Sequence, residues 1–415
     1  MENEKLVPKL RFAEFNETWE KHNLIDVINE FYNGQTPSRS NLSYWNGNIP
    51  WTSVSDLNYG FITDTLEKIT TSGKESANLK ILPKNTFIIA IVGLEAKGTR
   101  GSCALLGVDS TINQACVALI PNKNKLNHHF MVQWYLNVGD KYGIKYTQGT
   151  KQQNYNIDLL KKLPIIIPSN MQEQNKIGLF LFKVDEKIRL LKEKMEVYIS
   201  FKKYLMQQIF AQKLRFKTDN GKDYGDWEHL KLKDVISLNG GYAFKSELFK
   251  NEGIPIIRIS NISSESNSVN LDDLVYYDKL DNDSDFIIKK GELIIAMSGA
   301  TTGKVAVYDF EQNSYVNQRV GLFKKVSDNL YYPFLVQYTL SDSFKRELQK
   351  TLVAGAQPNI SKKEIESFNI DLPTFEEQEK IANLLSDLDL KINTIKNQIK
   401  DISVFKKALL QQMFV

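Results

Sequence analysis

The sequence is poor in the residues that most often hold metals or form disulfides. Among 415 residues there are two cysteines, Cys103 and Cys116, and four histidines, and neither set has the spacing of a metal site. We therefore expect two buried thiols in a reducing compartment. The N-terminal segment lacks the apolar stretch of a signal peptide, and the longest apolar run near it, residues 87–92, is far too short to cross a membrane. These absences predict a soluble, cytoplasmic protein with no membrane partner.

Catalytic signatures are also missing. Residues 298–306, SGATTGKVA, resemble a phosphate-binding loop, but they have three residues between the glycines instead of four, and Val305 stands where Ser or Thr should bind the metal. A glycine-rich strand–turn–strand fits this segment better. The triplet Glu95-Ala96-Lys97 resembles part of a nuclease metal motif, but no paired Asp accompanies it. No serine lies in a nucleophile elbow, and the catalytic tetrapeptide of amino-methylating DNA enzymes is absent. We therefore expect a non-catalytic chain without cofactor or metal.

Charge of one sign is not in large excess either. The formal net charge is +4, which permits a polyanionic partner without demanding one. Residues 1–170 hold 18 basic and 15 acidic side chains and residues 171–215 hold 10 and 5, whereas residues 216–372 hold 19 and 23. The positive excess lies in the first half, so any basic surface of the second half must be local.

What the sequence does contain is an internal repeat with a period of about 204 residues. FKKYLMQQIF at residues 201–210 recurs as FKKALLQQMF at 405–414, and EQNKI from Glu173 recurs as EQEKI from Glu377. Asn113-Gln114 and Val132-Gln133 recur as Asn317-Gln318 and Val336-Gln337, and Trp19 and Trp227 each precede an Asp-Val-Ile. Chance cannot produce this ordered series, so the chain consists of two similar halves.

Each half begins with about 160 residues in which short apolar runs alternate with turn signals. The expected strands cover residues 87–92, 115–120 and 163–167 in the first half, and 254–259, 293–297 and 305–308 in the second. Asn33-Gly34, Asn46-Gly47 and Asn239-Gly240 are expected turns, and residues 333–350 an amphipathic helix. The pattern predicts an α+β protein with two mixed α/β modules that have strand-rich cores.

A long helix is expected after each module. Ser169 with Gln172, and Thr374 with Glu377, have the spacing of capping boxes. Beyond them, apolar residues alternate at spacings of four and three, the a/d pattern of a coiled coil, and both series break at Lys202 and Lys406. The shared register favours two helices that pack against each other, although each could instead lie on its own module. The predicted domains are a first module at residues 1–168, a first helix at 169–214, a second module at 215–372 and a second helix at 373–415.

The tetrapeptide KLRF connects the ends of the repeat. It opens the first module at residues 9–12 and the second at residues 213–216, directly after the first long helix. Because the second helix ends at Phe414, the sequence corresponds to a closed ring cut between the C-terminus and residue 9. Such a ring predicts pseudo-two-fold symmetry, antiparallel long helices and chain ends that lie close together.

Taken together, these features resemble the DNA-specificity subunit of bacterial type I restriction–modification systems over the full length of the chain. The resemblance rests on the EQ-plus-heptad helices at residues 173–210 and 377–414 and on the module-end sequences GTKQQNYN and GAQPNIS. In that family a Gly, a small residue, a Gln and an Asn lead into the last strand of a module. The matching residues are Gly149, Thr150, Gln152 and Asn154 in the first half, and Gly355, Ala356, Gln357 and Asn359 in the second.

The resemblance implies that the chain reads a split double-stranded DNA target, one half-site per module, across a spacer of unread bases. The long helices would hold two methyltransferase subunits, and restriction/translocase subunits would dock onto that core. Adenine methylation and ATP-driven cleavage would belong to these partners, which agrees with the motifs missing here. Helices of about 40 residues are roughly 60 Å long, enough to set half-site centres about one DNA turn, roughly 34–36 Å, apart.

Candidate DNA-contacting residues are polar side chains in glycine-bounded loops, because side chains read base edges while Lys and Arg on phosphates fix the register. In the first module they are Arg39, Lys97, Arg100, Lys151 and Gln152. In the second they are Lys245, Arg258, Lys304, Arg319 and Gln357. Each could instead be a solvated charge or a structural hydrogen-bonding residue. For Asn154 and Asn359 we favour a structural role, in which the side chain pins the turn into the last strand.

Two other functions remain open. One is a pseudo-symmetric coiled-coil scaffold whose modules bind proteins without DNA specificity. Divergent modules on near-identical helices argue against it, because that pattern suits exchangeable recognition on a fixed platform. The other is a stand-alone DNA-modifying enzyme, which would need a cofactor site that the sequence lacks.

Overall fold

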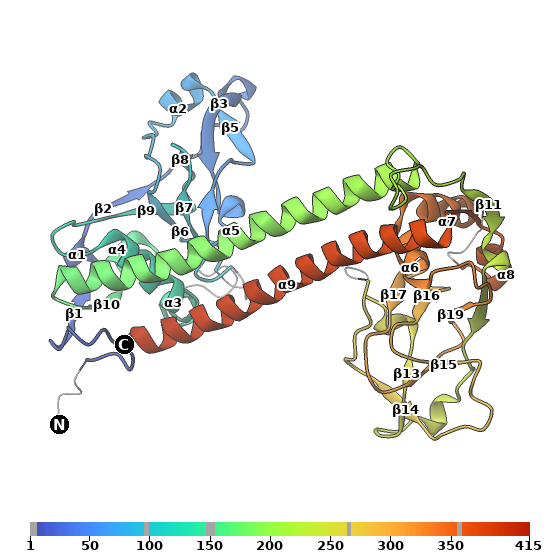
Figure 1. The fold of residues 1–415 in the computed structure, drawn as a ribbon. Helices are drawn as coiled ribbons and strands as arrows, with labels where there is room; N and C mark the ends of the chain where they lie inside the picture. Colours follow the sequence, from blue (N-terminus) through green and yellow to red (C-terminus); the bar gives the residue numbers. More distant parts are fainter. Residues whose placement is uncertain (1–5, 95–98, 147–153, 264–266, 355–358) are drawn as a thin grey trace. The chain divides into compact units, whose positions relative to one another are not determined.

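The computed structural model describes residues 6–94, 99–146, 154–263, 267–354 and 359–415 (Figure 1). The chain divides into two units, one formed by residues 1–192 with 397–415 and the other by residues 193–396. The division falls inside both long helices, α5 (Met171–Phe210) and α9 (Phe375–Met413), so each unit contains part of both.

The first unit combines three sheets with the helices that cover them. Its strands are β1 (Glu20–Asn23), β2 (Ile28–Asn33), β3 (Trp45–Thr52), β4 (Phe61–Ile62), β5 (Glu67–Ile69), β6 (Phe87–Ala90), β7 (Cys103–Leu106), β8 (Thr111–Ile112), β9 (Cys116–Pro121) and β10 (Pro164–Ile167). Its shorter helices are α1 (Leu24–Val27), α2 (Thr71–Ser76), α3 (His128–Tyr146) and α4 (Ile157–Lys161). The sheets have the orders β2-β9-β6-β7-β4, β5-β3-β8 and β1-β10.

The second unit repeats this plan. Its strands are β11 (Glu228–Lys231), β12 (Ile236–Gly240), β13 (Ile254–Ile257), β14 (Val275–Tyr277), β15 (Ile287–Ile288), β16 (Leu293–Ala296), β17 (Val305–Val307), β18 (Ser314–Val316), β19 (Val320–Lys325) and β20 (Asn369–Leu372). Its shorter helices are α6 (Tyr332–Leu340), α7 (Asp342–Ala354) and α8 (Lys362–Glu366). The sheets have the orders β12-β19-β16-β17, β14-β13-β18-β15 and β11-β20. In both units the third strand of the module pairs in parallel with a later strand, β3 with β8 and β13 with β18.

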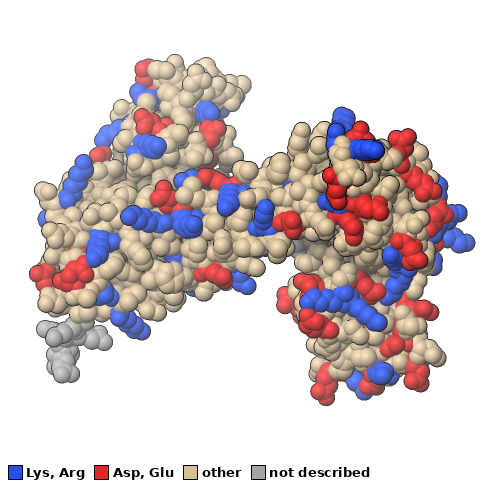
Figure 2. Space-filling model, in the orientation of Figure 1, with Lys and Arg blue, Asp and Glu red and all other residues tan. Residues whose placement is uncertain are grey.

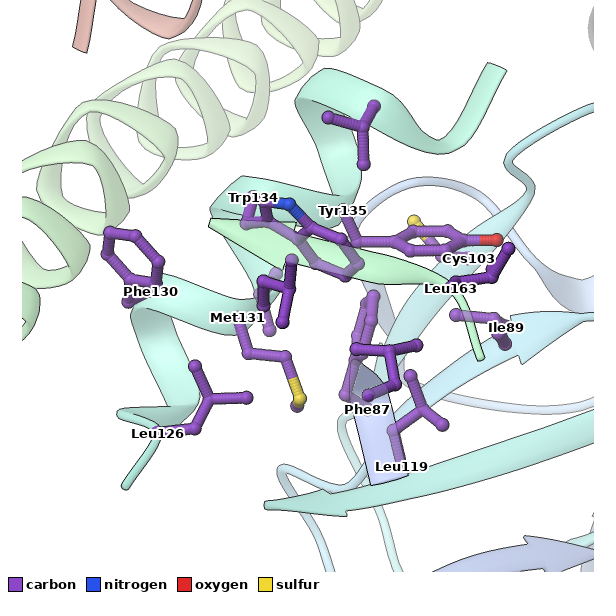
Figure 3. Close-up of a cluster of buried hydrophobic side chains, with 14 of the residues drawn as sticks. Phe87, Ile89, Cys103, Leu119, Leu126, Phe130, Met131, Trp134, Tyr135 and Leu163 are labelled. Carbon is purple, nitrogen blue, oxygen red and sulfur yellow. The ribbon is translucent and has the colours of Figure 1, made fainter. Parts of the chain in front are cut away.

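The central strand of each module is buried on both of its faces. In β6, Phe87 and Ile89 belong to the core beneath α3, where they lie near Met131 and Tyr135 (Figure 3). Ile88, between them, belongs to a separate core on the other side of the sheet. This alternation explains why the strand reads as a continuous apolar run, since a strand covered on both faces needs no polar positions.

The expected strands are confirmed, with ends that differ by at most two residues. Other predictions are wrong. Asn239-Gly240 is not a turn, because both residues are paired with β19 at the end of β12. Residues 333–350 do not form one helix, because the chain is extended at Ser341 (φ −72°, ψ 160°), between α6 and α7. Asn46-Gly47 is not a hairpin turn. It lies inside β3, where Asn46 adopts φ 59° and the pairing with β5 shifts register, so the signal marks a bulge.

The glycine-rich segment at residues 298–306 is the predicted strand–turn–strand. It connects β16 to β17, and the chain closes the turn with a hydrogen bond from the Gly303 amide to the Ala296 carbonyl (2.8 Å). Gly299 and Gly303 both have φ +81°, a left-handed conformation that Gly adopts without strain. The two glycines therefore allow the backbone to form the turn of this hairpin.

The long helices pack together inside each unit. In the first unit Ile177 and Leu181, near the start of α5, share a core with Leu409 and Met413, near the end of α9. In the second unit the pairing is reversed, because Leu205 and Ile209 of α5 share a core with Ile381 and Leu385 of α9. The helices are therefore antiparallel, and each packs both on the other helix and on a module. None of the helices among the described residues combines the length and apolar character of a membrane span.

The two ends of the chain meet as the ring pattern predicts. In the second unit, where the chain is continuous, the amide of Leu214 in KLRF donates to the carbonyl of Gln208 (3.1 Å). In the first unit the amide of Leu10, in the other KLRF, donates to the carbonyl of Gln412 (2.8 Å). Leu10 and Gln412 are the repeat partners of Leu214 and Gln208, so the same hydrogen bond forms across the ends of the chain.

Candidate nucleic-acid interface

Each module has a corner at which three chain segments meet through backbone hydrogen bonds. In the first module the Asn113 amide donates to the Thr52 carbonyl and the Gln35 amide to the Ile112 carbonyl, at 2.9 and 3.2 Å. In the second, the Asn317 amide donates to the Ile257 carbonyl and the Tyr242 amide to the Val316 carbonyl, both at 2.9 Å. The repeated Asn-Gln pairs thus mark the same corner in both halves.

A glycine is required at each corner. A Cβ atom on Gly34 would lie 1.9 Å from the Ile112 carbonyl oxygen, and one on Gly241 would lie 2.2 Å from that of Asn317. Any other residue would push the segments apart. The close approach of the backbone segments at each corner therefore depends on this glycine.

Three candidate residues of the second module lie at or near this corner. Arg258 follows Ile257 directly, Arg319 lies two residues after Asn317, and Lys245 follows the segment that begins at Gly241. Lys245 and Arg319 are exposed. Arg258 is half-buried, and its Nη2 donates to the Asp273 carbonyl (2.7 Å), which holds the guanidinium in place. The fourth, Lys304, is exposed at the end of the β16–β17 turn.

The same backbone positions carry different side chains in the first module. Ala90 and Ala296 donate to the carbonyls of Ser102 and Lys304, at 2.8 and 2.9 Å. Ile91 and Met297 donate to the carbonyls of Ala115 and Arg319, both at 2.9 Å. Equivalent backbone positions therefore carry Ser102 and Ala115 in the first module, and Lys304 and Arg319 in the second.

In the first module Arg39 is exposed but not free. Its Nη2 lies 2.8 Å from Oε2 of Glu67, its guanidinium lies 3.7 Å from the ring centroid of Trp45, and the bond to Glu67 raises the pKa of Arg39. Arg100 is half-buried, with its aliphatic stem against Gly143 of α3. Both arginines therefore make contacts within the first module, and their role in binding DNA stays a prediction. Lys97, Lys151, Gln152 and Gln357 lie outside the described residues.

The module-end asparagine of the first half has the structural contact expected of it. Oδ1 of Asn154 accepts a hydrogen bond from the Gly93 amide (3.2 Å), which ties the last segment of the module to the loop after β6. The next residue, Tyr155, donates its amide to the Ile91 carbonyl (2.8 Å), as Ile360 does to Met297 (2.9 Å) in the second half.

A buried network that the sequence did not predict fastens each module to its helix. Glu173 on α5 accepts from Nε (2.6 Å) and Nη2 (2.7 Å) of Arg11 and from Nε1 of Trp19 (3.3 Å). Glu377 on α9 accepts from Arg215 at 3.2 and 2.8 Å and from Nε1 of Trp227 (3.1 Å). Repetition of Arg, Trp and Glu in both halves was the available signal. The expected capping boxes are wrong, because Glu377 turns to this network and the Gln172 amide donates to Asn170 (2.9 Å).

The glutamine that follows each of these glutamates also has matching contacts. Oε1 of Gln174 accepts from the Asn127 amide and its Nε2 donates to the Lys125 and Pro168 carbonyls, at 2.7–3.0 Å. Gln378 repeats this set with Tyr331, Asn329 and Pro373, at 2.8–2.9 Å. The EQ motif therefore locks the start of each long helix to its module.

The two lysines that interrupt the heptads form a second repeated network. Lys202 is buried and its Nζ lies 2.6 Å from both carboxylate oxygens of Asp389, while Lys406 lies 2.5 Å from Asp185. Each aspartate also accepts from a module glutamine, Gln337 (3.0 Å) or Gln133 (2.8 Å). The break in the apolar pattern is thus a polar contact between the two helices, repeated in each unit.

The cysteines and the metal-binding side chain types form no reactive site among the described residues. Cys103 and Cys116 are buried and unbridged, and burial raises the pKa of the Cys103 thiol to about 12 and that of Cys116 further, so neither is a nucleophile at neutral pH. Within the described ranges no group of three His, Cys, Asp or Glu side chains could hold a metal. On the face drawn in Figure 2, basic and acidic side chains are interspersed in both units.

Comparison with known proteins agrees with this architecture. The model of the family described as type I restriction modification DNA specificity domain matches residues 16–197 and again residues 224–403. The MjaVIII specificity subunit of Methanocaldococcus jannaschii is 25% identical over 403 residues, covering 95% of this chain and 91% of that protein. The EcoR124I/EcoR124II specificity subunit of Escherichia coli is 28% identical over 180 residues, 42% of this chain and 43% of that protein.

Solved structures share the fold. The S subunit of a type I restriction–modification system from M. genitalium superposes with a TM-score of 0.68 at 17% identity, over 99% of both chains. A chain from a study of type I complex assembly superposes with a TM-score of 0.51 at 16% identity, over 95% of this chain and 97% of that one. The doubled match covers most of the sequence. The chain therefore belongs to the type I restriction–modification DNA specificity family, and it contains two copies of the specificity domain.

Proposed function

We propose that this chain is the non-catalytic, DNA-recognising subunit of a type I restriction–modification complex, with one half-site of a bipartite double-stranded target read by each module. The observation that carries the proposal is the contrast between repeated supports and divergent surfaces. The Glu–Arg–Trp and Gln networks recur in both halves, whereas equivalent corner positions carry Ser102 and Ala115 in one module and Lys304 and Arg319 in the other. A protein whose two modules recognise different DNA sequences, and whose modules are attached to the long helices by the same contacts, would have this construction.

The partners in this proposal are two methyltransferase subunits and the restriction/translocase subunits that dock on them. Phe201 on α5 and Phe405 on α9 are repeat partners, and their exposed fractions are 48% and 54%. Aromatic side chains at matching exposed positions suit two copies of the same protein partner, because aromatic residues are enriched in protein interfaces. Methylation and ATP-driven cleavage would be supplied by these subunits.

A domain exchange tests the proposal. Replacing the second module, residues 217–372, with that of a relative should change one half of the methylated sequence and leave the other half and the spacer unchanged. Sequencing of methylated adenines in cells that express the chimera with its methyltransferase reads out both halves. If both halves change together, the modules do not read independently, and our domain boundaries at 168, 214 and 372 lose their functional meaning.

A gel-shift series separates this function from the alternatives. The chain with its methyltransferase should prefer the mapped duplex over a scrambled one of the same composition. A protein-binding scaffold would show no preference, and a stand-alone enzyme would methylate or cut without the partner.

Arg319 gives a test at one residue. If its guanidinium contacts guanine bidentately, Arg319→Ala should weaken binding by about 1–3 kcal/mol and relax the requirement at one base pair. A phosphate contact would instead weaken binding to all sequences alike. Arg346→Ala is the matched control, because Arg346 is an exposed arginine of the same unit whose Nη2 bonds Ser343 on its own helix (3.1 Å). Equal effects of the two substitutions would remove Arg319 from the interface.

A further inference from the structure

A cleft of about 580 Å³ opens in the second unit, among the end of α5, the β16–β17 turn and the α6–α7 junction. Its walls carry four lysines, Lys202, Lys203, Lys304 and Lys345, and the acidic residue Asp342. The lysines come from three elements that are far apart in the sequence, so the fold itself gathers them. This is notable in a module whose overall composition is acidic, with 19 basic and 23 acidic side chains in residues 216–372.

The charges of the cleft are not balanced from within. Lys202 is paired with Asp389, but Lys203, Lys304 and Lys345 are exposed and form no ion pair with any carboxylate of the described part of the chain. The carboxylate of Asp342 accepts from Nε2 of Gln207 (3.1 Å). Three lysines without an ion pair therefore face one aspartate in this cleft. An anion bound there would supply the counter-charge that these lysines lack.

We propose that this cleft binds phosphates of the DNA backbone beside the half-site that the second module reads. The inference rests on the proposed function and extends it to a defined phosphate-binding site. Lys ammonium groups are strongly hydrated point charges that suit phosphate oxygens better than the planar edges of bases. Lys304 is held near Arg319, since the amides of Ala296 and Met297, which are neighbours on β16, donate to the carbonyls of Lys304 and Arg319. Phosphates held in the cleft would therefore fix the register in which the corner meets the bases.

The test uses the full chain assembled with its methyltransferase and a duplex that carries the mapped target. The variant is K203Q/K304Q/K345Q, which removes three charges and leaves the Lys202–Asp389 pair intact. Each lost phosphate contact lowers the slope of log Kd against log salt by about 0.9. Between 50 and 200 mM salt, the affinity of the variant should therefore fall about 40-fold less than that of the wild type. The ratio of target to scrambled-duplex affinity should stay unchanged.

The matched control is K233Q/K279Q/K289Q, which removes three exposed lysines of the same unit that do not line the cleft. It should keep the wild-type salt slope. In wild-type complexes, DNA should also protect Lys203, Lys304 and Lys345 from acetylation, read by mass spectrometry, and should leave Lys279 reactive. This second measurement does not depend on the variant folding.

The outcomes separate the two proposals. A wild-type complex with no preference for its target would overturn the proposed function itself. A wild-type preference, with an unchanged slope in the cleft variant and no protection of the three lysines, would overturn the cleft alone. Loss of methyltransferase assembly without a change in slope would assign the cleft to a protein partner and would also overturn it.

Discussion

Several side chains of the first unit are held by partners that lie far along the chain. Asn154 has the structural role predicted for it, because its Oδ1 accepts from the Gly93 amide, but the segment that it ties down leads into α4 and not directly into the last strand. The contacts of Arg39 could not be predicted from the sequence. Glu67 lies 28 residues further along the chain, and the Trp45 ring reaches the Arg39 guanidinium only through the fold of β3. Glu173 was seen as part of a motif, but its bond to Arg11 spans 162 residues and forms only in three dimensions.

The buried histidines of the first unit give a prediction about pH. Burial, with a smaller contribution from His129, lowers the pKa of His128 to about 4, and burial also lowers the pKa of His129, whose ring packs against Phe182. An unfolded histidine has a pKa near 6.5, so the unfolded state binds more protons between these values. Stability should be complete above about pH 6.5 and fall as the pH drops towards 4. The loss from His128 should be on the order of 2 kcal/mol.

Urea unfolding of the wild type and of His128→Gln, measured from pH 4 to 7, checks this expectation. The variant should lose part of the acid sensitivity. Ile62→Val is the control, because this buried apolar residue belongs to a different core and should lower stability about equally at all pH values. The same slope in wild type and His128→Gln would show that this histidine does not contribute.

Elements were predicted well by periodicity and poorly where backbone geometry changes within a pattern. The heptads located both long helices, since a/d spacing sustained over many turns is typical of a coiled coil and of few other structures. The split at Ser341 could not be predicted from periodicity, because α6 is largely apolar, α7 is amphipathic, and nothing in this pattern marks the extended residue between them. The bulge at Asn46 was mistaken for a turn because both require a left-handed residue, and only strand pairing distinguishes them.

The lysines that interrupt the heptads should be important for helix pairing. Asp389→Asn leaves the ammonium of Lys202, whose side chain is 10% exposed, without a counter-charge, and should destabilise the protein by about 1–3 kcal/mol, because Asp389 itself is partly exposed. The double variant Lys202→Met with Asp389→Asn should recover most of this loss, since it leaves no buried ammonium without a counter-charge.

Urea unfolding followed by tryptophan fluorescence measures both effects, and the four proteins form a double-mutant cycle. Glu30→Gln is the control, because the Lys80–Glu30 pair is exposed to solvent and should contribute little to stability. Full stability of Asp389→Asn would mean that the repeated lysine does not hold the helices together.

At the scale of the whole molecule, the repeat was the most informative feature of the sequence. It predicted two modules, antiparallel helices and adjoining chain ends, and the bond from Leu10 to Gln412 reproduces the one from Leu214 to Gln208. The repeat could not show which loop residues contact DNA, because those positions are the ones that differ between the halves. The difference between the two modules supports the proposed function. The same difference prevents the repeat from identifying the residues of the proposed interface.

The long helices should also set the distance between the two half-sites. Leu191 and Ile395 lie within two residues of the division between the units, so one heptad inserted after each leaves the Lys406–Asp185 and Lys202–Asp389 contacts within their own units. Each helix lengthens by about 10 Å at 1.5 Å per residue, which corresponds to about three base pairs at 3.4 Å each. Three base pairs also turn the far half-site by about 100° around the duplex, at roughly 10.5 pairs per turn.

The insertion variant should therefore lose methylation of targets with the original spacer. A helix pair that can twist slightly should gain methylation of targets whose spacer is longer by one to three base pairs, with both half-sites unchanged, whereas a fully rigid pair should methylate neither. A library of duplexes with varied spacers, methylated in vitro with the methyltransferase partner and sequenced, reads this directly. Seven residues inserted at Gly221, an exposed turn residue with φ +75°, form the control and should keep the original spacer. If the helix variant retained wild-type activity on the original spacer, the separation would be set by the partner subunits or by bending of the DNA, because a longer helix pair could not otherwise hold both modules on sites at the old distance.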